Sequence, residues 1–197
     1  MGKYLLISIV VVAMTYGCRA TRTAQEPVQQ PEVVAAVVEQ KVEETPVVAK
    51  VNFYNPETFL IGYYQSALLH KPPHSVWYQK EYDKYEPNEQ ITQKIAGTNV
   101  DDVSILIVMG SWCGDSQREV PRFIKMLDQC GLAKINVTYL GVDLSKQSPV
   151  GDYDKLEIKK VPTFIVYRNK VEVGRIIEYP STSLEQDMLE ILSKEIK

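Results

Sequence analysis

The second half of the chain shows the clearest pattern of hydrophobic and polar positions. Residues 104–109 form an uninterrupted apolar run, which is typical of a strand buried on both faces. A helical pattern follows, with apolar residues at Val120, Phe123 and Leu127. The pattern then predicts a strand over 136–142, a hairpin with strands over 165–167 and 171–177, and a helix over 183–196. This order predicts an α/β fold with a central mixed sheet flanked by helices.

Residues 51–99 are predicted to form an N-terminal helical extension. Asn55-Pro56-Glu57 is typical of a helix start, because it offers a capping side chain, a first-turn proline and an acidic group facing the helix dipole. The Pro72-Pro73 pair marks a break, since a residue before proline is disfavoured in a helix. The three helices expected in this region cover about 55–69, 75–85 and 87–95.

Aromatic residues gather in this extension. Trp77, Tyr78, Tyr82 and Tyr85 are spaced so that most of them lie on one face of the second predicted helix. Such a face can line a groove for an aromatic ligand or pack on the core, and we favour packing.

The N-terminus has the pattern of an export signal over residues 1–18. Lys3 precedes an apolar run over 4–14, and small residues lead to Cys18. Eleven residues of helix reach about 16 Å, too short to cross a bilayer. The segment resembles a bacterial lipoprotein signal, which implies that Cys18 is lipidated and that the protein is held in the cell envelope, facing the periplasm. A conventional signal with a chance cysteine is the alternative.

Residues 19–50 are predicted to be a disordered tether. The segment contains no aromatic residue, leucine, isoleucine or glycine, and it is rich in valine, glutamine and glutamate. Such a composition cannot bury enough apolar surface to offset the entropy of ordering. The tether would let a folded domain work clear of a membrane surface.

Composition limits the possible functions. The chain has 22 basic and 25 acidic residues, for a net charge of −3, which argues against nucleic-acid binding. Its two histidines, His70 and His74, have no third ligand nearby, so no metal site is expected. The three cysteines, Cys18, Cys113 and Cys130, are an odd number and cannot all pair within one chain.

The residues around Cys113 resemble the thioredoxin family. Trp112 precedes the cysteine at a strand-to-helix junction, Pro121 lies within the following helix, and Val161-Pro162-Thr163 leads into the hairpin. The resemblance covers residues 100–197 and implies a thioredoxin-like fold. It further implies that Pro162 is cis. The residues that it places against a substrate are Trp112, Gly114, Val161, Pro162 and Thr163.

Cys113 is the candidate nucleophile, because a helix N-terminus favours a thiolate. Ser116 stands where dithiol members of the family carry their second cysteine, and its hydroxyl could donate a hydrogen bond to the thiolate. A hydroxyl cannot resolve a mixed disulfide. Cys130 is about 25 Å further along the same predicted helix, beyond the roughly 7 Å Cα separation that a disulfide allows. Ile107 also replaces the buried acidic residue usual in the family's strand.

Two functions remain open at this stage. The first is monothiol exchange through Cys113 with protein or low-molecular-weight thiols and disulfides, without a cofactor. The second is a redox-inactive binding module that keeps the fold. Cys-Gly-Asp-Ser, residues 113–116, is also similar to the motif of monothiol glutaredoxins, but Trp112 and the Val-Pro-Thr segment favour a thioredoxin.

Overall fold

The computed structural model describes residues 52, 54–132 and 134–194. The predicted signal, the lipidation site Cys18 and the predicted tether over 19–50 lie outside these residues. Within the described part of the chain, no helix is long and apolar enough to span a membrane.

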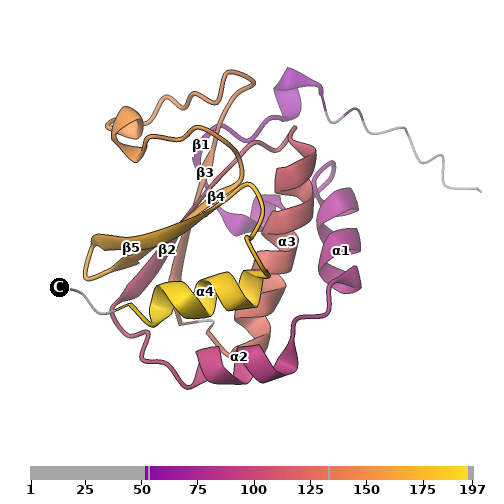
Figure 1. Cartoon of the computed structure of the whole chain (residues 1–197). Helices are drawn as coiled ribbons and strands as arrows, with labels where there is room; N and C mark the ends of the chain where they lie inside the picture. Colours follow the sequence, from indigo (N-terminus) through magenta and orange to yellow (C-terminus); the bar gives the residue numbers. More distant parts are fainter. Residues whose placement is uncertain (1–51, 53, 133, 195–197) are drawn as a thin grey trace, which may run out of the picture. The chain divides into compact units, whose positions relative to one another are not determined.

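A mixed five-stranded sheet forms the centre of the fold (Figure 1). The strands lie in the order β1-β3-β2-β4-β5, with β2 and β3 parallel and every other neighbouring pair antiparallel. This confirms the predicted α/β class and mixed sheet. The strands are β1 (Gly62–Tyr64), β2 (Val103–Met109), β3 (Asn136–Gly141), β4 (Thr163–Arg168) and β5 (Val171–Ile177).

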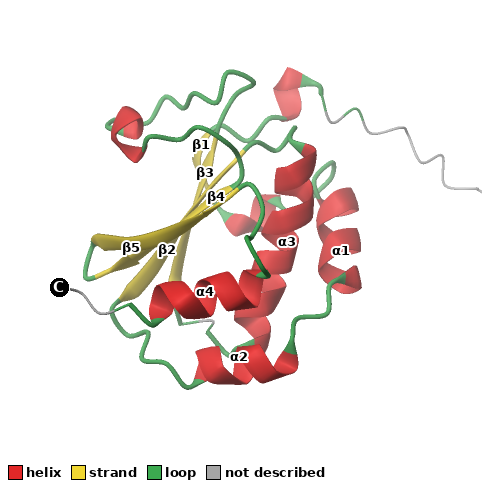
Figure 2. Ribbon diagram, viewed as in Figure 1, coloured by secondary structure: helices red, strands yellow, loops and turns green. Residues whose placement is uncertain are grey.

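Four α-helices lie on one side of this sheet (Figure 2). Two of them begin at side-chain caps, because Asn88 Oδ1 accepts from the Ile91 N–H and Ser183 Oγ accepts from the Gln186 N–H. The last helix ends at Leu192, earlier than its apolar pattern predicts. The helices are α1 (Ser75–Lys84), α2 (Glu89–Ala96), α3 (Gly114–Gln129) and α4 (Leu184–Leu192).

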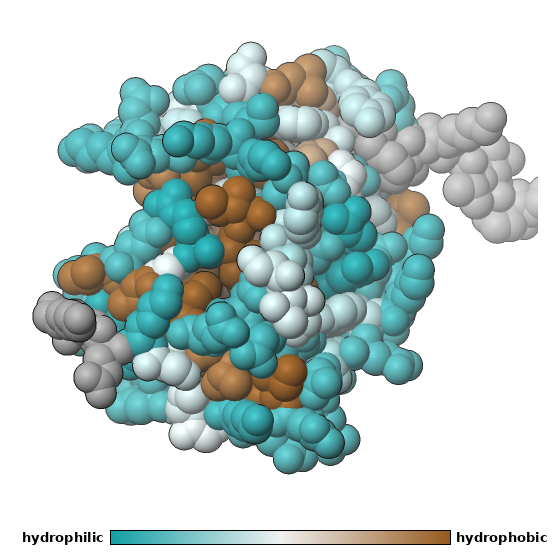
Figure 3. Space-filling model, viewed as in Figure 1, coloured by the Kyte–Doolittle hydropathy of each residue, from teal (hydrophilic) through white to brown (hydrophobic). Residues whose placement is uncertain are grey.

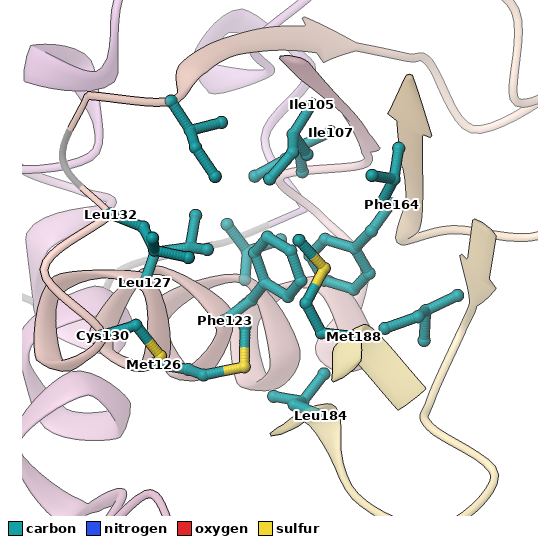
Figure 4. Packing of buried hydrophobic residues seen from close by; sticks show 14 of the residues in the cluster. Ile105, Ile107, Phe123, Met126, Leu127, Cys130, Leu132, Phe164, Leu184 and Met188 are labelled. Carbon is teal, nitrogen blue, oxygen red and sulfur yellow. The ribbon is translucent and has the colours of Figure 1, made fainter. Parts of the chain in front are cut away.

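The two faces of the sheet are covered differently. On the helical side, Phe123 of α3 stacks on Phe164 of β4 with ring centroids 4.3 Å apart (Figure 4). Met188 of α4 belongs to the same apolar cluster. On the other side, Leu106 and Val108 belong to a second cluster, which is covered by the β3–β4 connection and its short 3₁₀ helix η3 (Tyr153–Leu156).

The predicted helix over 55–69 is wrong. The predicted cap is observed, since Asn55 Oδ1 accepts a hydrogen bond from the Glu57 N–H. Only the 3₁₀ turn η1 (Pro56–Thr58) follows it, in place of an α-helix. The chain then forms β1 and a second 3₁₀ turn, η2 (Ser66–Leu68). Residues 62–64 form a strand because they pair with the distant strand β3. The two segments lie so close that a Cβ on Gly141 would come within 1.9 Å of the Leu60 carbonyl oxygen.

The aromatic residues of α1 pack into the structure. Trp77 and Tyr78 are buried in the helical-side cluster. Tyr82 donates a hydrogen bond to Asp128, and Tyr85 donates one to Glu185. The structure therefore places this face against α3 and α4, as the packing interpretation expects.

Cys130 lies at the C-terminal end of α3 and is buried in the same cluster. Burial raises the pKa of its thiol to about 11, and the nearby Glu185 carboxylate adds to the rise. Cys130 therefore remains a neutral thiol near neutral pH and fills space in the core.

Removing the Phe123 ring tests the core. Phe123→Ala should lower the free energy of unfolding by about 3–5 kcal/mol, because it leaves a cavity against Phe164. Urea denaturation followed by circular dichroism measures this change. The exposed Val171→Ala is the control and should stay within about 0.5 kcal/mol of wild type.

Thiol labelling tests the raised pKa of Cys130. At a pH of about 8, iodoacetamide should label Cys130 slowly in the native protein, because little thiolate is present there. In urea the label should appear quickly, and in the native protein the rate should increase as the pH rises toward the pKa of about 11. Peptide mapping by mass spectrometry distinguishes Cys130 from the other cysteines, and equal rates in the folded and unfolded protein would contradict the assignment.

Candidate functional site

Cys113 lies at the junction between β2 and α3. It occupies the N-cap of α3 with extended backbone dihedrals, and its side chain caps no helix N–H. The Cys113 N–H donates to the Gly110 carbonyl at 2.9 Å, which closes the tight turn between strand and helix. The side chain is partly exposed. The sulfur is therefore reachable and lies at the positive end of a 16-residue helix.

The segment before β4 lies directly against this sulfur. Cys113 Sγ donates to the Val161 carbonyl at 3.4 Å, and the Val161–Pro162 peptide bond is cis, as the resemblance implied. Thr163 is buried, and its hydroxyl donates to the Lys160 carbonyl at 2.7 Å. Val161, Pro162 and Thr163 are all buried, and the Pro162 carbonyl accepts a hydrogen bond from the Glu178 N–H.

The Trp112 side chain, next to Cys113 in the sequence, is fixed by one hydrogen bond and by packing on the backbone. Its indole Nε1–H donates to the Val142 carbonyl at 3.0 Å. A Cβ on Gly110 would come within 2.6 Å of the Trp112 ring, so the ring packs directly on the backbone of that glycine. Gly114, by contrast, is exposed and has open space around it.

Ser116 is completely buried in the first turn of α3. Its Oγ accepts a hydrogen bond from the Gly110 N–H at 3.3 Å, which ties the end of β2 to the helix. The hydroxyl proton is not used in this bond. Donation from Ser116 to a Cys113 thiolate stays a prediction, because in this structure the two side chains make different hydrogen bonds.

Cys113 and Cys130 occupy opposite ends of α3, as the N-cap and the C-cap. At 1.5 Å per residue the helix separates them by about 25 Å. The structure therefore keeps the two thiols apart, as the helix prediction required.

The ion pairs formed by charged residues near Cys113 were not predicted from the sequence. Asp115 forms an ion pair with Arg118 at 2.9 Å, and their spacing of three residues within a helix was the available signal. Lys160 forms an ion pair with Glu178, which joins the segment before Pro162 to the chain after β5. No sequence signal predicted this second pair, because its partners are distant along the chain.

A cavity lies near Thr163, beside the β4–β5 hairpin. Figure 3 shows hydrophobic surface in a hollow between the hairpin and the segment that carries η3. A cavity of about 390 Å³ lies there, lined by Glu157, Lys159 and Thr163 from the segment before and at the start of β4 and by Glu172, Arg175 and Ile177 of β5.

The solved structures that are similar to this chain include thioredoxins and a protein of unknown function. Thioredoxin O2 from Arabidopsis thaliana, in its oxidised state, is 20% identical over 53% of this chain and 85% of its own, with a TM-score of 0.34. Thioredoxin f from spinach chloroplast is 22% identical over 57% of this chain and 88% of its own, with a TM-score of 0.33. A protein of unknown function from Pseudomonas aeruginosa is 14% identical over 60% and 79%, with a TM-score of 0.44.

Comparison of sequences gives the family. Among curated proteins there is no match to the chain. A family model described as thioredoxin matches residues 70–191, which is more than half of the 197 residues. The matched range contains Trp112, Cys113 and the cis-proline segment, and this chain belongs to the thioredoxin family.

Proposed function

We propose that this protein carries out monothiol thiol–disulfide exchange through Cys113 with protein or low-molecular-weight thiols and disulfides. The observation that supports this most is the placement of Cys113 Sγ, partly exposed at the start of α3 and 3.4 Å from the Val161 carbonyl beside cis-Pro162. A thiolate there is accessible and is favoured by the helix N-terminus.

The proposed reaction begins with attack of the Cys113 thiolate on one sulfur of a client disulfide. A new disulfide joins Cys113 to the client, and the other client sulfur leaves as a thiolate. An external thiolate then attacks the Cys113 sulfur and releases the client, and a second external thiolate frees Cys113. One client disulfide is reduced, and two external thiols are oxidised to their own disulfide.

The need for an external thiol follows from the residues around Cys113. Ser116 occupies the position of a resolving cysteine, and Cys130 is buried at the far end of α3. Ile107, in the place of the family's usual acidic residue, is fully buried in apolar surroundings and cannot transfer a proton. In our proposal, Ser116 assists the thiolate, and Trp112, Gly114, Val161, Pro162 and Thr163 form the surface that receives the client.

The proposed location is the cell envelope. The sequence pattern before Cys18 supports export and lipidation of that cysteine, with the folded domain facing the periplasm. An oxidising compartment supplies disulfides for Cys113 to attack.

Insulin reduction driven by dithiothreitol tests the monothiol mechanism. The wild-type rate should be low, and Cys113→Ser should reduce it to background. Ser116→Cys should raise the rate about tenfold or more, because an intramolecular thiol acts at a high effective concentration. The matched control is Ser145→Cys, which adds a thiol on an exposed loop and should leave the rate unchanged. A wild-type rate equal to that of a dithiol thioredoxin would refute the monothiol mechanism.

Trapping in cells tests whether exchange takes place there. On a Cys130→Ser background, Cys113 should accumulate mixed disulfides, because no internal thiol resolves them. Mass spectrometry after acid quenching identifies what is attached, and Cys113→Ser on the same background is the control. If Cys113 carries nothing, the alternative of a redox-inactive binding module is favoured.

A further inference from the structure

Three segments that are distant in sequence meet beside Cys113. The end of β2 pairs with the end of β3, where Met109 lies opposite Gly141. On the other side of β3, Gly62 of β1 lies opposite the same Gly141. The turn of residues 110–113 follows β2 at this point and leads into α3. The chain just before β1 therefore reaches the turn that carries Cys113.

Ser111 forms the link between this turn and the chain before β1. Its side chain is 3% exposed, and its Oγ accepts a hydrogen bond from the Leu60 N–H at 3.1 Å. Its carbonyl accepts a second hydrogen bond from Gln117 Nε2 of α3 at 2.8 Å. Two residues before Cys113, the turn is thus held by Leu60 from one side and by Gln117 from the other.

The donor at Leu60 is itself fixed in place. Its carbonyl oxygen lies against the backbone of Gly141, in the space that a Cβ there would fill, and its side chain packs against the helical-side cluster. Leu60 therefore has little freedom to follow the turn if the turn moves. The family model matches residues 70–191, so this donor comes from a part of the chain outside the matched range.

We propose that Ser111 is a positioning residue for Cys113 and that it acts through its hydrogen bond to Leu60. The inference rests on the proposed function and adds a residue to it. Without the Ser111 oxygen, a part-buried N–H would lack its acceptor and the turn would lose its link to the chain before β1. The same turn sets the direction of the Cys113 side chain, whose sulfur lies 3.4 Å from the Val161 carbonyl. Exchange requires the attacking sulfur to approach the client disulfide in a defined direction, so a loosened turn should slow it.

Removing the hydroxyl tests the proposal. In Ser111→Ala, the rate constant for exchange with 2-hydroxyethyl disulfide, a small neutral probe, should fall about tenfold, because a misplaced nucleophile reacts in fewer encounters. Ser183→Ala is the matched control, since Ser183 Oγ also accepts from a backbone N–H at 3.1 Å, but at the start of α4. Its rate should equal that of wild type, although α4 loses its cap. An unchanged rate in Ser111→Ala, or an equal loss in Ser183→Ala, would overturn the proposal.

A second pair of variants separates the hydrogen bond from side-chain packing. Leu60→Pro removes the N–H donor, and the preceding Phe59 already has the extended backbone that a residue before proline needs. Leu60→Ala shortens the side chain but keeps the N–H, so it should slow exchange less than Leu60→Pro. Because both changes break the same bond, Ser111→Ala combined with Leu60→Pro should be no slower than the slower single variant. Losses that multiply in the double variant would show that Ser111 acts by another route and would contradict the proposal.

Alkylation separates the positioning role from the exchange function. Iodoacetamide reacts with Cys113 without any disulfide, and peptide mapping by mass spectrometry assigns the label to this cysteine. The native rate should be lower in Ser111→Ala than in Ser183→Ala, because the thiolate loses its fixed place at the start of α3, and the two rates should be equal in urea. If alkylation responds to Ser111→Ala but the wild type exchanges with no disulfide, the positioning role is supported and the exchange function is refuted. If wild type and Ser111→Ala exchange at the same rate, the function is supported and the positioning role is refuted.

Discussion

The burial of β2 on both faces is the constraint on which the rest of the structure depends. Ile105 and Ile107 pack under the helices, while Leu106 and Val108 pack under the segment that carries η3. Because β2 pairs with β3 on one side and β4 on the other, neither its register nor its end can shift without exposing apolar side chains. The end of β2 therefore determines where the turn to α3, and Cys113 within it, must lie.

Cys113 lies where the two apolar clusters meet. Helix α3 belongs to the cluster under the helices, and Val161 belongs to the cluster on the opposite face. The bond from Cys113 Sγ to the Val161 carbonyl connects the two, and the bond from the Gly110 N–H to Ser116 holds the turn beneath it. The position of the sulfur is thus fixed by core packing, and its chemistry is set by a helix end and a backbone carbonyl.

Ion pairs offset the negative charges in the first turn of α3 and at the α1–α3 interface. Asp115 lies two residues from Cys113, and Arg118, 2.9 Å from the Asp115 carboxylate, offsets its negative charge. Arg122 does the same for Glu81 across the α1–α3 interface. In the proposed reaction, the burial of Cys130 at the far end of α3 makes an external thiol necessary.

The sequence by itself determined the elements whose signals are local. The apolar run of β2, the Asn55 cap and the motif around Cys113 each predicted an observed feature, because hydrophobic period, capping and turn chemistry act over a few residues. Only the tertiary structure decided that 62–64 is a strand, since its pairing with β3 joins residues far apart in sequence. The same holds for the Lys160–Glu178 pair and the bond from Leu60 to Ser111, because long-range packing brings their groups together.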